Sequence, residues 1–216
     1  MDGREQEKRA AAEAATLLVQ DGMTVGLGTG STVAHFLPAL ARRQLAITCV
    51  ATSVSTETTA RSLGLALDPF DAVDRLDLVV DGADQVAPDL WLIKGRGGAH
   101  LREKIAAAAA DRFVVIVSSD KLVGEIGPPV PLEVLSFGLG ATIRTLSSFG
   151  EVRTRHGVTP DGNVLLDFYA PVDDPEQLSG TLDAVPGVVG HGLFAPNLVA
   201  EVLVGKADGS VDRLTS

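Results

Sequence analysis

Four charged side chains that could handle hydroxyl groups or protons lie within residues 76–104. Asp81 and Asp84 follow an apolar run, Lys94 ends a second one, and Glu103 lies in the first turn of the helix expected next. A positioned carboxylate can remove a proton, and a positive group held nearby can stabilise negative charge on oxygen. These residue types therefore indicate a polar site that binds hydroxyl groups or moves protons.

Each of these residues also has a purely structural explanation. Asp81 and Asp84 can be turn formers, since Asp-Gly is common in turns. Lys94 can extend its ammonium group to solvent, and Glu103 can be an ordinary solvated helix residue. The functional interpretation is favoured because all four fall at the ends of adjacent predicted strands, where an open α/β sheet places its polar site.

A second candidate site is the first glycine loop, which we define as residues 28–32, Gly-Thr-Gly-Ser-Thr. It lies between a predicted strand and a predicted helix, where backbone N–H groups and the helix dipole can bind an anion. It is not the dinucleotide fingerprint, because Ser31 replaces the third glycine, and no Gly-Lys-Ser/Thr of a Walker loop follows. A phosphate site and a simple tight strand-to-helix turn both explain it.

The elements that would position these residues alternate between strand and helix. Aromatic residues make up only 4% of the chain, so the core must be aliphatic, as in a buried parallel sheet. The pattern predicts four helices: one at 4–20, one that follows the first glycine loop and ends at residue 43, one that ends at residue 63, and one at 99–111. It predicts strands at 23–27, 46–51, 76–80 and 113–117. This order predicts an α/β fold with a doubly wound, mostly parallel, Rossmann-like sheet.

The proline-rich segment Gly-Pro-Pro-Val-Pro, at residues 127–131, is the best candidate for a domain boundary. A helix from Leu132 or Glu133 to Phe149 is expected, then strands at 151–155 and 164–169, a helix at 175–185 and a strand at 187–194. Strands at 200–204 and 210–214 could return the chain to the first domain. The predicted division is residues 1–127 plus 205–216 as catalytic domain, and 128–204 as a smaller α+β, ferredoxin-like subdomain.

Charge and composition exclude several classes of function. The net charge of −10 argues against binding of nucleic acid or anionic membranes, so an anionic substrate needs a local positive cluster. The N-terminus is charged and no apolar stretch reaches membrane-spanning length, which makes a cytoplasmic protein the expectation. Cys49 lies in an apolar run and is expected to be a buried, inert thiol.

No metal site is predicted. The four histidines are scattered without metal-type spacing, at His35, His100, His156 and His191, and only His100 lies beside the candidate site. The spaced acids Asp68, Asp71, Asp74 and Asp77 lack the glycine and final glutamate of a calcium loop. Ser55 is expected to cap the helix that follows it.

Several motifs in order along the whole chain resemble the type A ribose-5-phosphate isomerase family. They are GLGTGSTVAHF at the first glycine loop, DGAD at 81–84, KGRGG from Lys94, REKI at 102–105, SSDK at 118–121, PLEV at 131–134 and DGNVLLD at 161–167. The resemblance implies interconversion of D-ribose 5-phosphate and D-ribulose 5-phosphate with no metal or organic cofactor. It also implies a homodimer or homotetramer, for which the α+β subdomain is the expected interface.

The same resemblance assigns roles to residues. Glu103 is the base that moves a proton between C1 and C2, Lys94 stabilises the oxyanion, and Asp81 and Asp84 hold hydroxyls and assist ring opening. The substrate-binding set is Thr29, Gly30, Ser31, Thr32, Gly82, Ala83, Gly95, Arg96, Gly97, Lys121 and Lys8.

Four residues depart from the usual family sequence: Gln85, Arg96, His100 and Leu101. These departures bear on substrate preference and rate more than on the reaction class. A non-catalytic sugar-phosphate sensor and an amino-sugar-phosphate deaminase are the alternatives. The sensor would need a DNA-binding helix-turn-helix, and here the first helix runs directly into the first glycine loop. The deaminase would need a histidine site that the sequence does not show.

Overall fold

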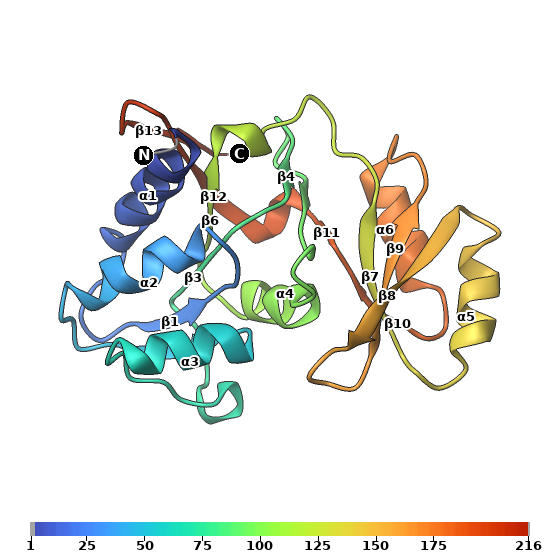
Figure 1. Cartoon of the computed structure of the whole chain (residues 1–216), viewed down its shortest axis with the longest axis horizontal. Helices are drawn as coiled ribbons and strands as arrows, with labels where there is room; N and C mark the ends of the chain where they lie inside the picture. The colour runs from blue at the N-terminus through green and yellow to red at the C-terminus, as the bar shows by residue number, and fades with distance from the viewer. Residues whose placement is uncertain (1–2, 216) are drawn as a thin grey trace. The chain divides into compact units, whose positions relative to one another are not determined.

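The computed structural model describes residues 3–215, which fold as two compact units. Of the described residues, the first unit contains 3–83, Arg102–Leu122 and 196–215, and the second contains Asp84–Leu101 and Val123–Ala195. Figure 1 labels most of the elements of both. Each unit is described by itself.

A six-stranded sheet forms the centre of the first unit, in the order β13-β12-β6-β3-β1-β2. All neighbouring pairs are parallel except β12 and β13, so the predicted mostly parallel α/β fold is confirmed. Every residue of β3 and β6 is buried, as expected for central parallel strands. The strands are β1 (Thr24–Leu27), β2 (Thr48–Ala51), β3 (Leu78–Asp81), β6 (Phe113–Ser118), β12 (Val199–Gly205) and β13 (Val211–Leu214).

The first helix of the unit packs closely on this sheet through its alanine residues. In α1 (Gly3–Thr16) the buried residues include Ala11, Ala12 and Ala15. Its backbone approaches β12 so closely that a Cβ at Gly205 would lie 1.8 Å from the Glu7 carbonyl oxygen. The other helices are α2 (Val33–Ala41), α3 (Val54–Ser62) and α4 (His100–Ala108), with short 3-10 turns η1 (Phe70–Ala72), η2 (Ser119–Lys121) and η3 (Pro196–Leu198).

Strand register places the expected polar residues of this unit along one edge of the sheet. Leu27 pairs with Ala51 on one side and with Val80 on the other, so the segments that follow β1, β2 and β3 begin at the same level. Asp81 in turn pairs with Val115 of β6. The carboxyl edge of a parallel sheet is where α/β proteins bind ligands.

The second unit contains an antiparallel sheet with two helices. Its elements follow the order β7 (Val130–Val134), α5 (Leu139–Leu146), β8 (Glu151–Val158), β9 (Val164–Tyr169), α6 (Pro175–Asp183) and β10 (Val188–His191). The sheet order is β10-β7-β9-β8, which makes this a ferredoxin-like βαββαβ arrangement. A three-stranded sheet of β4 (Gln85–Val86), β5 (Leu92–Ile93) and β11 (Leu193–Phe194) completes the unit, with β5 in its centre.

The helix predicted from residue 132 or 133 to 149 was wrong in its first half. Residues 130–134 form the buried strand β7, which pairs with both β9 and β10, and the helix begins only at Leu139. The reason is that this short apolar run is buried on both faces of a sheet, where periodicity cannot distinguish strand from helix. The buried Glu133 accepts hydrogen bonds from Thr159 (2.9 Å) and from Asn163 (2.9 Å).

Several element boundaries also differ from expectation. Helix α1 ends at Thr16, not at residue 20, and α3 is capped by Ser53 rather than Ser55: the Ser53 hydroxyl accepts from the Thr56 N–H at 3.2 Å. The strand predicted at 187–194 divides at Gly192 into β10 and β11, which belong to different sheets.

The two units differ from the predicted division at 127/128 and 204/205. Residues 84–101 belong to the second unit, although they precede residue 127. Strand β12 pairs with β6 and therefore lies in the first unit, although most of it precedes residue 205.

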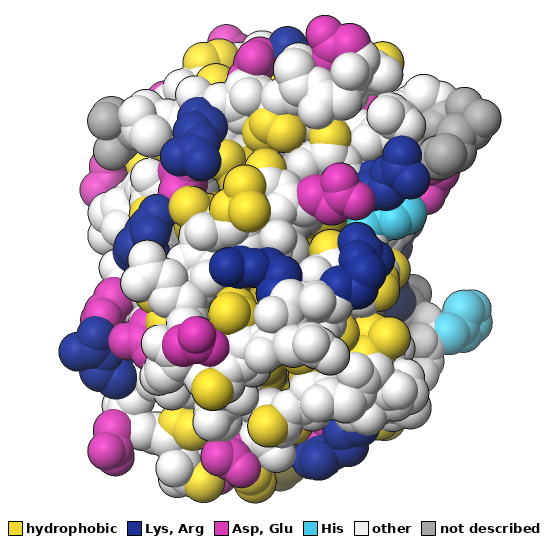
Figure 2. Space-filling view, turned by 90° about the vertical axis from the view of Figure 1, so that its left-hand side faces the viewer, with side chains coloured by type: hydrophobic (Ala, Val, Ile, Leu, Met, Phe, Trp, Pro, Cys, Tyr) yellow, Lys and Arg dark blue, Asp and Glu magenta, His cyan; other side chains and the backbone are white. Residues whose placement is uncertain are grey.

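Charged side chains of both signs share the surface of the first unit. Figure 2 shows Lys and Arg interspersed with Asp and Glu on the face that carries α1, α2 and α3. Among the helices within residues 3–215, none combines the length and the apolar character that crossing a membrane requires.

Candidate active site

Asp81 fixes the first glycine loop to the end of β3. The Asp81 Oδ1 atom accepts hydrogen bonds from the N–H groups of Thr29 (3.0 Å) and Gly82 (2.7 Å), and the side chain is fully buried. A Cβ at Gly28 would lie 2.0 Å from this carboxyl group, so only glycine permits the approach. Asp81 is therefore more than a turn former, because its carboxylate sets the shape of the loop.

A cluster of hydroxyl groups holds the first glycine loop from the other side. The Thr29 hydroxyl donates to Ser53 at 2.8 Å and lies 3.2 Å from the hydroxyls of Thr52 and Thr56. The Thr56 hydroxyl also donates to the Gly28 carbonyl at 2.8 Å. Thr29 was expected to bind substrate, but its hydroxyl contacts this cluster.

The remaining loop residues lead into α2. Gly30 and Ser31 are exposed, whereas Thr32 is buried. Gly30 has φ +129°, in the region that favours glycine. The first turn of α2 begins at Val33, so its N-terminal N–H groups and positive dipole end adjoin the exposed part of the loop. This geometry fits a phosphate better than a mere tight turn.

Lys8 is connected to the same region through an ion pair. Its ammonium donates to Glu5 Oε1 at 2.7 Å, and Glu5 Oε2 lies 2.9 Å from His35 Nε2, in the first turn of α2. Hydrogen bonds from Lys8 and from His35 lower the pKa of Glu5. Lys8 is thus close to the start of α2, already paired with a carboxylate.

Lys121 follows β6 at the same edge of the sheet. The N–H and hydroxyl of Ser119 both donate to Glu7 of α1 at 2.8 Å, which attaches this turn to the helix that carries Lys8. Burial acts to raise the pKa of Asp120, but the Ser118 hydroxyl and the charges of Lys121 and Arg4 lower it overall. The first unit therefore brings Lys8, Lys121 and the first glycine loop to one edge of its sheet.

Glu103 is buried in α4, with only 5% of its surface exposed. A glutamate is rarely buried to this extent unless it is paired or functional. The interpretation of Glu103 as a solvated helix residue is therefore excluded. Gly82 and Ala83, which follow Asp81, are half-buried.

Lys94 is 2% exposed, so it does not extend to solvent as its structural explanation required. Its ammonium lies 5.4 Å from the centre of the Phe194 ring, a cation–π distance, and its backbone N–H donates to the Gly192 carbonyl at 2.9 Å. A Cβ at Gly192 would lie 2.1 Å from the Lys94 carbonyl oxygen. The backbone of Lys94 is thus packed closely against residue 192.

The Lys94 loop, which we define as residues 94–98, needs two of its glycines for its own geometry. Gly95 has φ +109° and Gly98 has φ +79°. A Cβ at Gly95 would lie 2.7 Å from His100 Nδ1, and one at Gly98 would lie 2.6 Å from a methyl group of Leu165. At Gly97 a Cβ would meet no atom of the described residues within 4 Å. His100 is therefore a packing partner of the loop.

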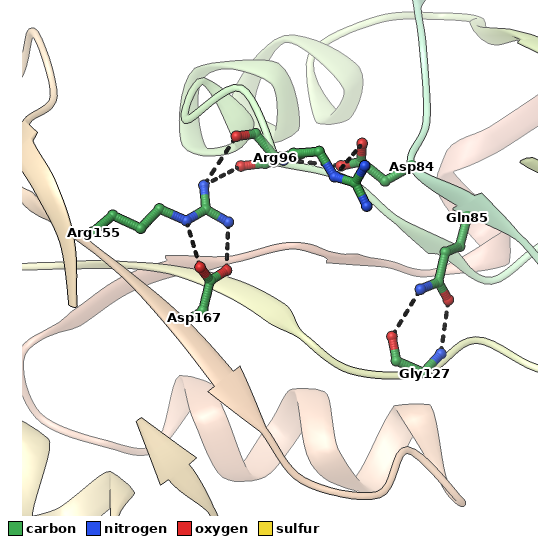
Figure 3. Close-up of polar contacts among 7 residues, drawn as sticks. Asp84, Gln85, Arg96, Gly127, Arg155 and Asp167 are labelled. Atoms are coloured by element: carbon green, nitrogen blue, oxygen red, sulfur yellow. Dashed lines mark hydrogen bonds and ion pairs between the residues drawn. The ribbon is translucent and has the colours of Figure 1, made fainter. Parts of the chain in front are cut away.

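Asp84 is bound to the Lys94 loop through Arg96. The Arg96 N–H donates to Asp84 Oδ2 at 2.9 Å, and the Arg96 Nε atom lies 3.9 Å from Oδ1 (Figure 3). The Arg96 side chain is 79% exposed. The backbone of Arg96, more than its side chain, is the part that orients Asp84.

Gln85 makes a paired contact that explains why it replaces the usual acid. Its amide donates to the Gly127 carbonyl at 2.9 Å and accepts from the Gly127 N–H at 2.7 Å (Figure 3). An ionised glutamate could accept from the N–H but could not donate to the carbonyl.

Sequence reasoning gave no role to Arg155, which contacts the Lys94 loop, or to Asp167, which is paired with Arg155. Arg155 donates to the carbonyl oxygens of Gly95 (2.8 Å) and Arg96 (3.1 Å) and is paired with Asp167 through two hydrogen bonds (Figure 3). The only sequence signal was that Asp167 ends the DGNVLLD motif on the strand face opposite to the buried Leu166 and Phe168.

Comparison with known proteins decides the family. The sequence model described as "Ribose 5-phosphate isomerase A (phosphoriboisomerase A)" matches residues 48–209. "Ribose-5-phosphate isomerase A" of Rhodopseudomonas palustris (strain TIE-1) is 44% identical over 97% of this chain and 97% of its own length. The chain belongs to the ribose-5-phosphate isomerase A family.

Solved structures agree with this family over almost the whole chain. A D-ribose-5-phosphate isomerase in complex with phospho-erythronic acid superposes with a TM-score of 0.93 at 37% identity, covering 100% of both chains. The ribose 5-phosphate isomerase A of Methanocaldococcus jannaschii gives a TM-score of 0.91 at 37% identity, covering 97% of this chain and 98% of that one. The ribose-5-phosphate isomerase A fold thus includes both units.

Proposed function

We propose that this chain interconverts D-ribose 5-phosphate and D-ribulose 5-phosphate, the reaction of its family, with Glu103 as the base. One observation carries this assignment: Glu103 is only 5% exposed, and it lies in the REKI motif, which holds the catalytic base in the family.

In the proposed mechanism, Glu103 removes the proton from C2 of the open-chain aldose. The electron pair of the C–H bond forms a C1–C2 double bond, and negative charge develops on the C1 oxygen, which gives a cis-enediolate. Return of the proton to C1, with transfer of the hydroxyl proton from O2 to O1, produces the ketose. Moving the proton through one carboxylate lowers the barrier by positioned acid–base catalysis.

Lys94 is proposed to stabilise the enediolate oxygen. A buried ammonium in a fixed position stabilises developing charge more strongly than one in water, because it needs no reorganisation during the reaction. The burial of Lys94 and the fixed backbone around it support this role. Asp84 is proposed to bind a sugar hydroxyl. Asp81 is proposed to do the same and to assist ring opening, while it also shapes the first glycine loop.

The phosphate is proposed to bind at residues 30–32, at the N-terminus of α2, with Lys121 and Lys8 nearby. This local group of N–H donors and ammonium groups gives a strongly acidic protein a site for an anion. The remaining members of the substrate-binding set are Gly82, Ala83, Gly95, Arg96 and Gly97. Thr29 is proposed to contribute to substrate binding through its backbone only, since its hydroxyl is hydrogen-bonded to other residues of the protein.

The test is formation of ribulose 5-phosphate from ribose 5-phosphate in the presence of EDTA. Wild-type protein should be active, because the family resemblance implies neither metal nor organic cofactor. Glu103→Gln should lose activity by a factor on the order of 10²–10⁴, as expected for removal of a general base, with its circular dichroism unchanged. An inactive wild type, or full activity in Glu103→Gln, would refute the proposal.

We also propose a cytoplasmic homodimer or homotetramer whose subunits meet through the α+β subdomain. The resemblance to the family supports oligomerisation, and an exposed Phe137 (91%) between β7 and α5 marks a face that could be covered by a second copy. Light scattering should give a mass of two or four chains, and Phe137→Ser should lower it. A monomeric wild type would contradict this.

A further inference from the structure

We propose that Arg155 and Asp167 form a positioning pair that holds the Lys94 loop in the conformation needed for catalysis, without contacting the substrate. This inference rests on the proposed function for its catalytic consequence. Its structural part, that the pair fixes residues 94–98, concerns the second unit alone and can be tested separately.

The guanidinium of Arg155 connects the sheet to the loop. Its Nε and Nη2 atoms donate to the two carboxylate oxygens of Asp167 at 3.0 and 2.5 Å. Its Nη1 atom donates to the carbonyl oxygens of Gly95 and Arg96 at 2.8 and 3.1 Å (Figure 3). Only an arginine can do both, because its planar fork offers donors in two directions, whereas a lysine offers a single ammonium.

The backbone of strand β8 is shaped to deliver this side chain. The register between β8 and β9 is regular from Glu151 to Thr154 and shifts before Val158, so Arg155 lies in the irregular part of the strand. Gly157 within this segment has φ +88°. An irregularity of this kind redirects a side chain and is frequent next to active sites. A surface ion pair alone would not require it.

The loop is held at further points that converge on Lys94 and Asp84. The Gly95 carbonyl that accepts from Arg155 also accepts from the Gly98 N–H at 3.0 Å. The Arg96 peptide presents its N–H to Asp84 and its carbonyl to Arg155. Loss of Arg155 would therefore release the peptides on the C-terminal side of Lys94 and loosen the contact that orients Asp84.

The functional test uses Arg155→Met and Asp167→Asn, with Arg153→Met as matched control. Arg153 lies on the same strand, pairs with Glu151 at 2.7 Å and stacks over Tyr169, but it is 61% exposed. Arg155→Met should lower kcat on the order of 10²-fold with a smaller change in KM, because a displacement of about 1 Å in a catalytic group has that effect. Arg153→Met should leave kcat unchanged.

A double-mutant cycle separates positioning of Lys94 from general stability. In a Lys94→Met background, Arg155→Met should reduce kcat little further, because the group it positions is already absent. If the two losses multiply, or if Arg155→Met behaves like Arg153→Met, the proposal is overturned. Arg155→Lys provides a milder variant should Arg155→Met fail to fold, and full wild-type kcat in Arg155→Lys would equally overturn it.

Amide hydrogen exchange tests the structural part without any substrate. The amides of Arg96 and Gly98 should exchange faster in Arg155→Lys and Asp167→Asn than in wild type or Arg153→Met, while amides of β9 keep their protection. Unchanged exchange at both amides would overturn the proposal. An inactive wild type would instead refute the proposed function, and the exchange result would still decide whether this pair holds the loop.

Discussion

Gln85→Glu should destabilise the second unit in a way that depends on pH. The wild-type amide donates to the Gly127 carbonyl and accepts from the Gly127 N–H. An ionised carboxylate can still accept from the Gly127 N–H but can no longer donate to the Gly127 carbonyl. A carboxylate oxygen then replaces the amide nitrogen that lies 2.9 Å from the carbonyl oxygen in the wild type, so two acceptors face each other. Losing one partner of a part-buried hydrogen bond costs about 1–2 kcal/mol.

The sign of the pH dependence follows from the protonated form. A neutral carboxyl can donate to the Gly127 carbonyl, so the folded state raises the pKa of the introduced group above its unfolded value, about 4.3. Stability associated with a raised pKa is fully present below the unfolded pKa and is lost as pH rises through the folded pKa. Gln85→Glu should therefore approach wild-type stability near pH 4 and fall below it at pH 7–8.

Urea unfolding followed by fluorescence measures this in the relevant unit. The single tryptophan, Trp91, lies in the turn between β4 and β5, where its carbonyl accepts from the Ala87 N–H. Gln20→Glu, at an exposed position of the first unit, serves as control. A stability difference that is absent at pH 8, or equal at pH 4 and pH 8, would refute the role assigned to the amide.

Three further predictions concern other residues. Gly97→Ala should keep the wild-type melting temperature, because no described atom lies within 4 Å of the new methyl group. It should raise KM by about tenfold if the substrate packs against Gly97, since overpacking costs about 1–3 kcal/mol. An unchanged KM would contradict that contact. Lys8→Met should raise KM by roughly tenfold with little change in kcat, because it removes one charge-assisted hydrogen bond to the phosphate. A loss confined to kcat would argue against phosphate binding by Lys8. Burial raises the pKa of the Cys49 thiol to about 12, so the native protein at pH 8 should react with iodoacetamide only at its unfolding rate, and its stability should fall as pH rises from the usual thiol pKa towards 12. Labelling as fast as a free thiol would contradict its burial.

The first unit could be predicted from sequence because each of its parts carries a local signal. Its central strands are continuous aliphatic runs, helices α1 and α4 are rich in alanine, and the polar turns follow the strands directly. Residues such as Asp81 and Thr29 could therefore be placed at the sheet edge, and the structure brings these two into direct contact.

The second unit was harder to predict because its critical features depend on distant partners. Residues 130–134 form a central strand only because β9 and β10 pair with them from both sides. Arg155 contacts Gly95 of the Lys94 loop across a separation of 60 residues, through a side chain in the irregular part of its strand. Spacing along the chain carries no signal for contacts of this kind.

Hydrogen exchange at C2 of the substrate tests the central claim most directly. Wild-type protein in D₂O should exchange the C2 proton of ribose 5-phosphate with solvent, as proton NMR would record, because Glu103 removes that proton and returns solvent deuterium. Glu103→Gln, with unchanged substrate binding by calorimetry, should leave the C2 proton in place. Exchange by Glu103→Gln at the wild-type rate would show that another group is the base.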